Sequence, residues 1–81
     1  MHNFTKNRFL SLPVEKQHKK CAQLLEVIYR NLLDGVEEKK NWIGYLELLG
    51  WMELAAPQTA SCQVIADCYH HHLRLANLSK K

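Results

Sequence analysis

At 81 residues the chain is long enough for one domain, and its composition of 47% hydrophobic and 23% charged residues is ordinary for a globular protein. It has only two prolines and three glycines, which supply few turns, so we expect a few long elements and exclude an all-β fold. No apolar run approaches the roughly 20 residues that a transmembrane helix requires, so we expect no membrane partner.

The formal net charge of +3 is unevenly distributed along the chain. Residues 1–20 carry a net charge of +4, residues 21–60 carry −3, and residues 61–81 carry +2. Basic ends favour an anionic partner, although charges on an ordinary solvated surface would produce the same pattern.

Three cysteines, Cys21, Cys62 and Cys68, are the basis for predicting the compartment. An odd number of cysteines, with no signal-like N-terminus, favours a reducing environment over a disulfide scaffold. We therefore expect a cytoplasmic protein.

Residues 1–12 mix apolar and polar side chains and are predicted to form either an arm or a short helix. Pro13 suits the first turn of a following helix. From there the inward-facing positions recur at alternating steps of four and three residues: Val14, His18, Cys21, Leu25, Ile28 and Leu32. This spacing predicts an amphipathic helix that ends at Asp34-Gly35, because glycine commonly follows a helix end.

A second helix is predicted to begin near Val36, with Glu37 and Glu38 in its first turn, where they complement the helix dipole. The segment Trp42–Ala56 that follows is apolar on nearly every side, so one neighbouring face is too small to cover it. The face expected to pack on the other helices contains Trp42, Tyr45, Leu46, Leu49 and Met52. The opposite face contains Gly44, Leu48, Trp51 and Ala55.

This opposite face is the predicted partner-binding surface. Gly44 would permit another helix to approach closely, and Trp51 is an aromatic anchor of the kind common at interfaces. We therefore predict a small interaction protein (an adaptor, chaperone-like subunit or regulator) that forms a homodimer through its second helix. One subunit of a heteromeric complex would use the same surface.

Ala56-Pro57-Gln58 is expected to end the second helix, and Thr59 or Ser61 to cap a third. The inward positions of the third helix are Ile65, Cys68, His72 and Leu75. Because the connections look short, the sequence predicts an all-α, up-down-up three-helix bundle over residues 13–78, with residues 79–81 as a frayed basic tail.

A metal-binding sensor is one alternative function. His18 and Cys21 are three residues apart on one predicted inward face, and Cys68 and His72 are four apart on another. In an up-down-up bundle these two helices run parallel, so the four side chains could share one level and form a tetrahedral zinc site. The competing interpretation is that the cysteines pack as small apolar residues and each histidine forms a hydrogen bond at the edge of the core.

A nucleic-acid-binding regulator is the other alternative. The order of the second helix, its turn and the third helix is that of a loose helix-turn-helix. The polar side chains available to read bases would be Gln58, Thr59, Ser61 and Gln63. However, Leu46–Gln63 contains no lysine or arginine, and phosphate contacts need cations. The basic start of the first long helix and the basic end of the third are also expected at opposite ends of the bundle.

The sequence contains no recognisable nucleophile motif and no glycine-rich phosphate loop. Asp67 and His71 are four residues apart and can pair on one helix, but no nucleophile accompanies them. We therefore expect neither enzymatic activity nor a cofactor.

Overall fold

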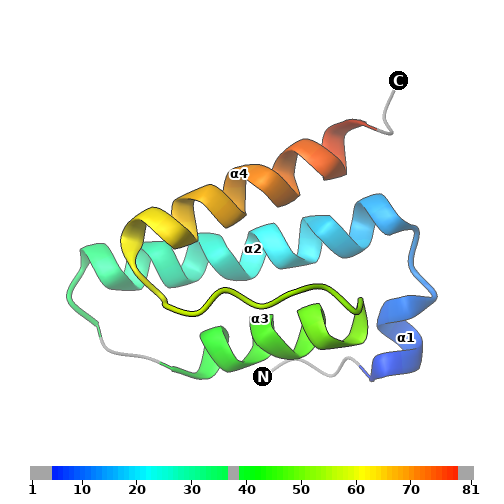
Figure 1. Ribbon diagram of the computed structural model, residues 1–81, viewed down its shortest axis with the longest axis horizontal. Helices are drawn as coiled ribbons and strands as arrows, with labels where there is room; N and C mark the ends of the chain where they lie inside the picture. The colour runs from blue at the N-terminus through cyan, green and yellow to red at the C-terminus, as the bar shows by residue number, and fades with distance from the viewer. Residues whose placement is uncertain (1–4, 37–38, 79–81) are drawn as a thin grey trace.

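The computed structural model describes residues 5–36 and 39–78. In these residues it contains α1 (Lys6–Leu10), α2 (Val14–Leu33), α3 (Lys40–Trp51) and α4 (Cys62–Leu78), shown in Figure 1. No strand occurs among the described residues, so the all-α class is confirmed, as are the three long helices and the short N-terminal one. The acidic turn predicted at Glu37 and Glu38, the tail at 79–81 and the start of the N-terminal arm lie outside the described residues.

The short helix α1 is fixed at both ends by local hydrogen bonds. The Thr5 hydroxyl accepts a bond from the Arg8 N–H at 3.3 Å, which caps the helix start. At the corner with α2, the Gln17 side-chain amide donates to the carbonyl oxygens of Leu10 and Leu12, at 3.3 and 2.9 Å. These bonds hold α1 against the start of α2, so the fully buried Phe9 ring reaches the core.

Helix α2 ends where the sequence predicts. Gly35 has φ of 73°, a left-handed conformation that glycine adopts without steric cost. The Gly35 N–H donates to the Leu32 carbonyl at 3.2 Å and the Val36 N–H to the Asn31 carbonyl at 2.8 Å, which together form a Schellman motif. Because Val36 completes this motif, α3 begins at Lys40, later than expected.

Helix α3 ends at Trp51, earlier than the predicted end at Ala56. Glu53 takes the left-handed conformation, with φ of 60°, and its N–H donates to the Gly50 carbonyl at 3.1 Å. The Leu54 N–H donates to the Leu49 carbonyl at 2.9 Å, so α3 also ends in a Schellman motif. A residue with a side chain costs about 1 kcal/mol in this conformation, which is why the sequence did not indicate an end here.

The connection between α3 and α4 determines the direction of α4. Residues 52–61 run back along the bundle, and α4 therefore lies antiparallel to α2, as Figure 1 shows. His18 meets His72 near one end, and Ile28 and Ile65 line the same groove toward the other. The expectation that the first and third long helices run parallel is wrong, because it assumed a short turn.

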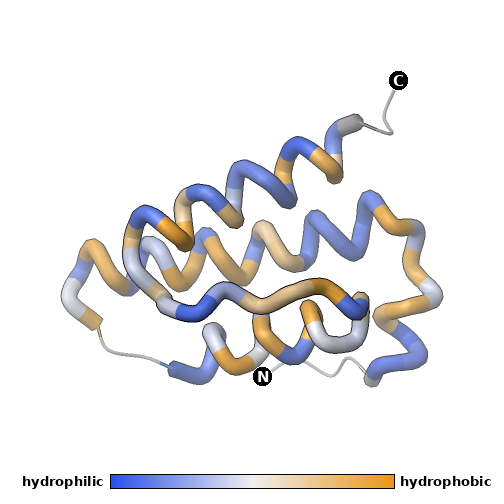
Figure 2. Tube along the Cα trace, viewed as in Figure 1, coloured by the Kyte–Doolittle hydropathy of each residue, from blue (hydrophilic) through white to orange (hydrophobic). Residues whose placement is uncertain are grey.

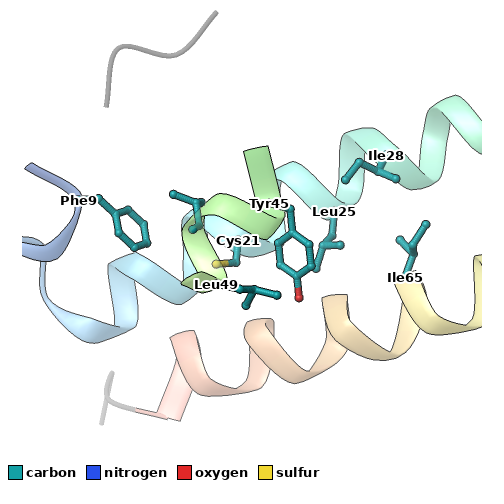
Figure 3. Close-up of a cluster of buried hydrophobic side chains, with 8 residues drawn as sticks. Phe9, Cys21, Leu25, Ile28, Tyr45, Leu49 and Ile65 are labelled. Carbon is teal, nitrogen blue, oxygen red and sulfur yellow. The ribbon is translucent and has the colours of Figure 1, made fainter. Parts of the chain in front are cut away.

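The core lies between the three long helices and is closed at one end by α1 (Figure 3). Its buried members are Phe9, Cys21, Leu25, Ile28, Tyr45, Leu48, Leu49 and Ile65. The stripe predicted along α2 is buried in its middle but exposed at its two ends, where Val14 is 61% and Leu32 40% accessible. Within the described residues, none of the helices combines the length and apolar character needed to cross a bilayer.

Candidate functional site

A buried chain of hydrogen bonds links the three long helices. The Nδ1 atom of His18 in α2 lies 2.9 Å from Nδ1 of His72 in α4, and the Tyr45 hydroxyl in α3 lies 2.9 Å from Nε2 of His72. All three side chains are less than 10% exposed. The chain thus uses both ring nitrogens of His72, the central residue, to join α2 and α3 to α4.

The facing Nδ1 atoms fix how many protons the pair can carry. One must carry a hydrogen and the other a lone pair, because two N–H groups at 2.9 Å would repel each other. If His72 donates to His18, its Nε2 accepts from the Tyr45 hydroxyl. If His18 donates, His72 is protonated at Nε2 and donates to the Tyr45 oxygen. Both arrangements satisfy the buried atoms with neutral rings.

Burial keeps these groups uncharged at neutral pH. It is the main cause that lowers the pKa of His72 to about 4, and the neighbouring His18 and His71 lower it further. Burial followed by the charge of His71 lowers the pKa of His18. Burial also raises the pKa of Tyr45 and raises that of Cys21 to about 12. The site therefore offers neither a thiolate nor an imidazolium, and its geometry is that of a structural link.

The predicted four-ligand metal site is not formed. The Cys21 sulfur lies 3.9 Å from the Met52 sulfur, and both ring nitrogens of His72 are engaged by His18 and Tyr45. In the part of the chain that the structure describes, no three His, Cys, Asp or Glu side chains are placed to hold a metal ion. The inward placement of His18 and His72 is confirmed, but their nitrogens bond to each other, and the partly buried Cys68 packs on the core beside the Tyr45 side chain.

The predicted partner-binding face is largely covered by the chain itself. Gly44 and Leu48 are buried, the latter in the core. The Trp51 ring is half-buried, with its centroid 5.7 Å from that of Phe9. Ala55 is exposed but lies beyond the end of α3. The prediction of an open surface is therefore wrong for Gly44 and Leu48, because other parts of the chain pack on this face of α3 as well.

Another apolar surface, at the junction of α2 and α3, was missed by the sequence analysis. We call it the junction surface; its four large side chains are 40–66% exposed and are Leu32, Leu33, Val36 and Ile43. Three of them, all except Leu33, border a groove of about 280 Å³ whose wall includes the half-buried Trp42. Figure 2 shows hydrophobic stretches of chain on both sides of the turn between the two helices. Ile43 falls on neither face of the predicted second helix, so helical periodicity gave no reason to select it.

A cavity of about 480 Å³ lies beside the buried chain, between α3, the α3–α4 connection and α4. Its apolar wall includes Leu54 and Pro57, and its polar side includes Tyr45, His72 and Asp67. The Asp67 carboxylate accepts a hydrogen bond from Gln63 at 2.9 Å, and among the described residues no buried side-chain N or O atom lacks a partner. The buried polar atoms of this lining are thus already satisfied, and the cavity offers a ligand mainly apolar contact.

The structure changes the argument for nucleic-acid binding, which rested on a recognition helix, and the argument against it, which rested on the separation of the basic segments. Helix α4 begins at Cys62, so Gln58 and Thr59 lie in the connection and do not start a recognition helix. Ser61 instead caps α4, with its hydroxyl accepting from the Val64 N–H at 3.2 Å. Conversely, the antiparallel direction of α4 brings its C-terminal end to the same end of the bundle as the basic start of α2 (Figure 1). The objection that the two basic segments lie at opposite ends is wrong.

Two features thus remain as candidates for function, the buried neutral chain and the exposed junction surface. The first is closed to solvent and internally satisfied, whereas the second leaves large apolar side chains in water. None of the family models, curated proteins or solved structures compared with this chain matches it.

Proposed function

We propose that this chain is a small helical protein-interaction module that self-associates through the junction surface. The observation that supports this proposal is the exposure of Leu33 at 66%, Ile43 at 62% and Val36 at 50% around a single end of the bundle. Contiguous apolar side chains of this size, rimmed by polar residues, commonly mark protein interfaces.

A second copy of the chain is the partner that the charges around this surface favour. Asp34 caps the end of α2 and Lys39 and Lys40 stand at the start of α3, all three exposed, so both signs of charge border this surface. In a two-fold symmetric dimer the same patch meets itself, so the acid of one protomer can pair with the lysines of the other. A partner of uniform charge would instead be repelled by one of the two signs of charge.

The energy of such a contact is consistent with a reversible dimer. Completing the burial of a half-exposed aliphatic side chain is worth about 1 kcal/mol, so four in each protomer contribute about 8 kcal/mol. Association itself costs on the order of 4–15 kcal/mol. At the lower end of that cost about 4 kcal/mol remains, which corresponds to a dissociation constant of about 1 mM. We therefore propose a weak dimer that exchanges, as suits an adaptor, a chaperone-like subunit or a regulator.

We place this module in the cytoplasm. The exposed Cys62 and the partly exposed Cys68 are free thiols, as is the buried Cys21. Accessible thiols persist in reducing compartments, and this supports the assignment.

Sedimentation equilibrium between about 5 and 500 µM tests the proposal. We expect the average mass of the wild-type protein to rise with concentration, and Ile43→Lys to keep the chain monomeric. Val14→Lys is the matched control, because Val14 is 61% exposed at the other end of α2. A wild-type protein that stays monomeric over this range, or an equal effect of both substitutions, would contradict self-association through the junction surface. Circular dichroism checks that both variants remain folded.

A further inference from the structure

The end of the bundle opposite the junction surface is basic. In α2, Lys16, Lys19 and Lys20 lie in the first half, much of which Figure 2 shows as hydrophilic, whereas Arg30 lies in the last turn and pairs with Glu26. The side chains of Lys16, Lys19 and Lys20 line one cleft of about 350 Å³, together with Leu12 and Gln23. Of the acids in this segment, Glu15 lies in the first turn of α2, whereas Glu26 lies further along and Asp34 caps the far end.

Two other elements add positive charge to this end. Helix α1, which contains the exposed Lys6 and Arg8, is held against the start of α2 by the Gln17 hydrogen bonds. The last turns of α4, with the exposed Arg74, reach the same end because α4 is antiparallel to α2 (Figure 1). Segments that are far apart in the sequence thus combine their charge, which raises the local concentration of an anionic partner.

We propose that this cleft binds the phosphodiester backbone of nucleic acid. Lys16, Lys19 or Lys20, and Gln23 follow one another along one side of α2, about one helical turn of 5.4 Å apart. A row of cations and an amide at this spacing suits a strand with regularly repeated phosphates better than it suits a single anion. A concave cleft also fits a strand better than it fits the flat surface of a bilayer.

The contacts in this cleft are of the kind that confer affinity without sequence preference. Lysine ammonium groups bind phosphate as point charges, and counterions released from the nucleic acid drive the association. Of the residues predicted to read bases, Gln58 and Thr59 lie in the α3–α4 connection, Ser61 caps α4, and Gln63 donates to Asp67. We therefore infer binding that depends on backbone charge. This inference is independent of self-association, since it uses the other end of the bundle.

Fluorescence anisotropy with a labelled random-sequence duplex of about 20 base pairs tests the proposal. The wild-type protein is titrated at salt concentrations from about 50 to 200 mM and compared with Lys16→Gln/Lys19→Gln. Both side chains are exposed, so the double variant keeps the fold. We expect the slope of log affinity against log salt to become shallower by about 2, since each phosphate contact contributes roughly 0.9. At the lowest salt we expect a loss of affinity of at least tenfold.

The matched control is Arg30→Gln, compared with Lys16→Gln alone; Arg30 is an exposed cation of the same helix that lines neither the cleft nor the groove of the junction surface. We expect Arg30→Gln to retain the wild-type salt slope and Lys16→Gln to make it shallower by about 1. Equal loss in these two single variants would show that only net charge matters and would overturn the assignment to this cleft. Absence of binding at about 50 mM salt would overturn it as well. The proposal would also be overturned if the protein bound vesicles containing phosphatidylserine but did not bind the duplex.

Discussion

The buried His72 makes the stability of the bundle depend on pH. Its pKa is about 4 in the folded protein, against 6.5 for an ordinary histidine. Between these two values the unfolded chain binds more protons than the folded one, so the free energy of unfolding falls as the pH falls. The loss begins near pH 6.5 and is complete near pH 4.

The size of the effect follows from the shift. Each pKa unit corresponds to about 1.4 kcal/mol, so the full loss is about 3 kcal/mol, of which about 2 kcal/mol is lost by pH 5. His72 is only 2% exposed, so solvent does not screen it. His18, whose pKa is also lowered, acts in the same direction, and the pair titrates as one unit. A domain of this size has a stability of about 5 kcal/mol, so the loss removes a large part of it.

Urea unfolding followed by circular dichroism at pH 7.5, 6.5, 5.5 and 5.0 measures this dependence, and these values lie above most carboxylate titrations. We expect the His72→Gln variant to be less stable at neutral pH but nearly insensitive to pH over this range. His70→Gln alters an exposed histidine of the same helix and should retain the wild-type slope. A change of less than about 0.5 kcal/mol in the wild-type protein from pH 7.5 to 5.0 would refute this account, because burial of the neutral ring predicts about 2 kcal/mol.

Two further predictions concern positions where the backbone or the core is unusual. Glu53→Gly should raise the free energy of unfolding by up to about 1 kcal/mol, because glycine adopts the left-handed conformation without strain. Glu53→Gln keeps a side chain at this position and should give no gain in stability. A gain as large as that of Glu53→Gly would show that removal of the charge, and not relief of backbone strain, is responsible. Phe9→Ala should lower the free energy of unfolding by about 3–5 kcal/mol and shift Trp51 fluorescence to longer wavelength, because α1 no longer covers the indole. The partly exposed Leu10 is the control for Phe9, and a Leu10→Ala variant with the same fluorescence shift would contradict this assignment.

Local signals predicted the long helices well. The inward stripe of α2 and the glycine at its end gave that helix nearly its full extent, because periodicity and a left-handed C-terminal residue are both written in the sequence. The end of α3 was missed because Glu53 occupies a conformation that sequence rules reserve for glycine. With that end misplaced, the connection looked like a short turn, and α4 was given the wrong direction.

At the candidate sites, tertiary contacts determine which side chains meet and which stay exposed, and the local sequence pattern did not settle either point. The spacing of His18 and His72 correctly placed both rings inward, but a metal site and a hydrogen-bonded pair differ only in where the nitrogen atoms point. The apolar excess of α3 was real, yet Phe9 of α1 packs on Trp51 at one end of it, while Ile43 remains exposed at the other end. Which face of a helix becomes buried depends on how the other elements pack against it. Helical periodicity alone does not carry that information.

The length of α2 has a consequence for how the two proposed surfaces would work together. Its 20 residues span about 30 Å, with the lysine cleft near the first turns and the junction surface at the last turn. A dimer joined at the junction surfaces would carry its two clefts on opposite outer ends, up to about 60 Å apart. Such a particle is bivalent, so a nucleic acid long enough to reach both clefts would be held by avidity, and a short one by a single weak contact.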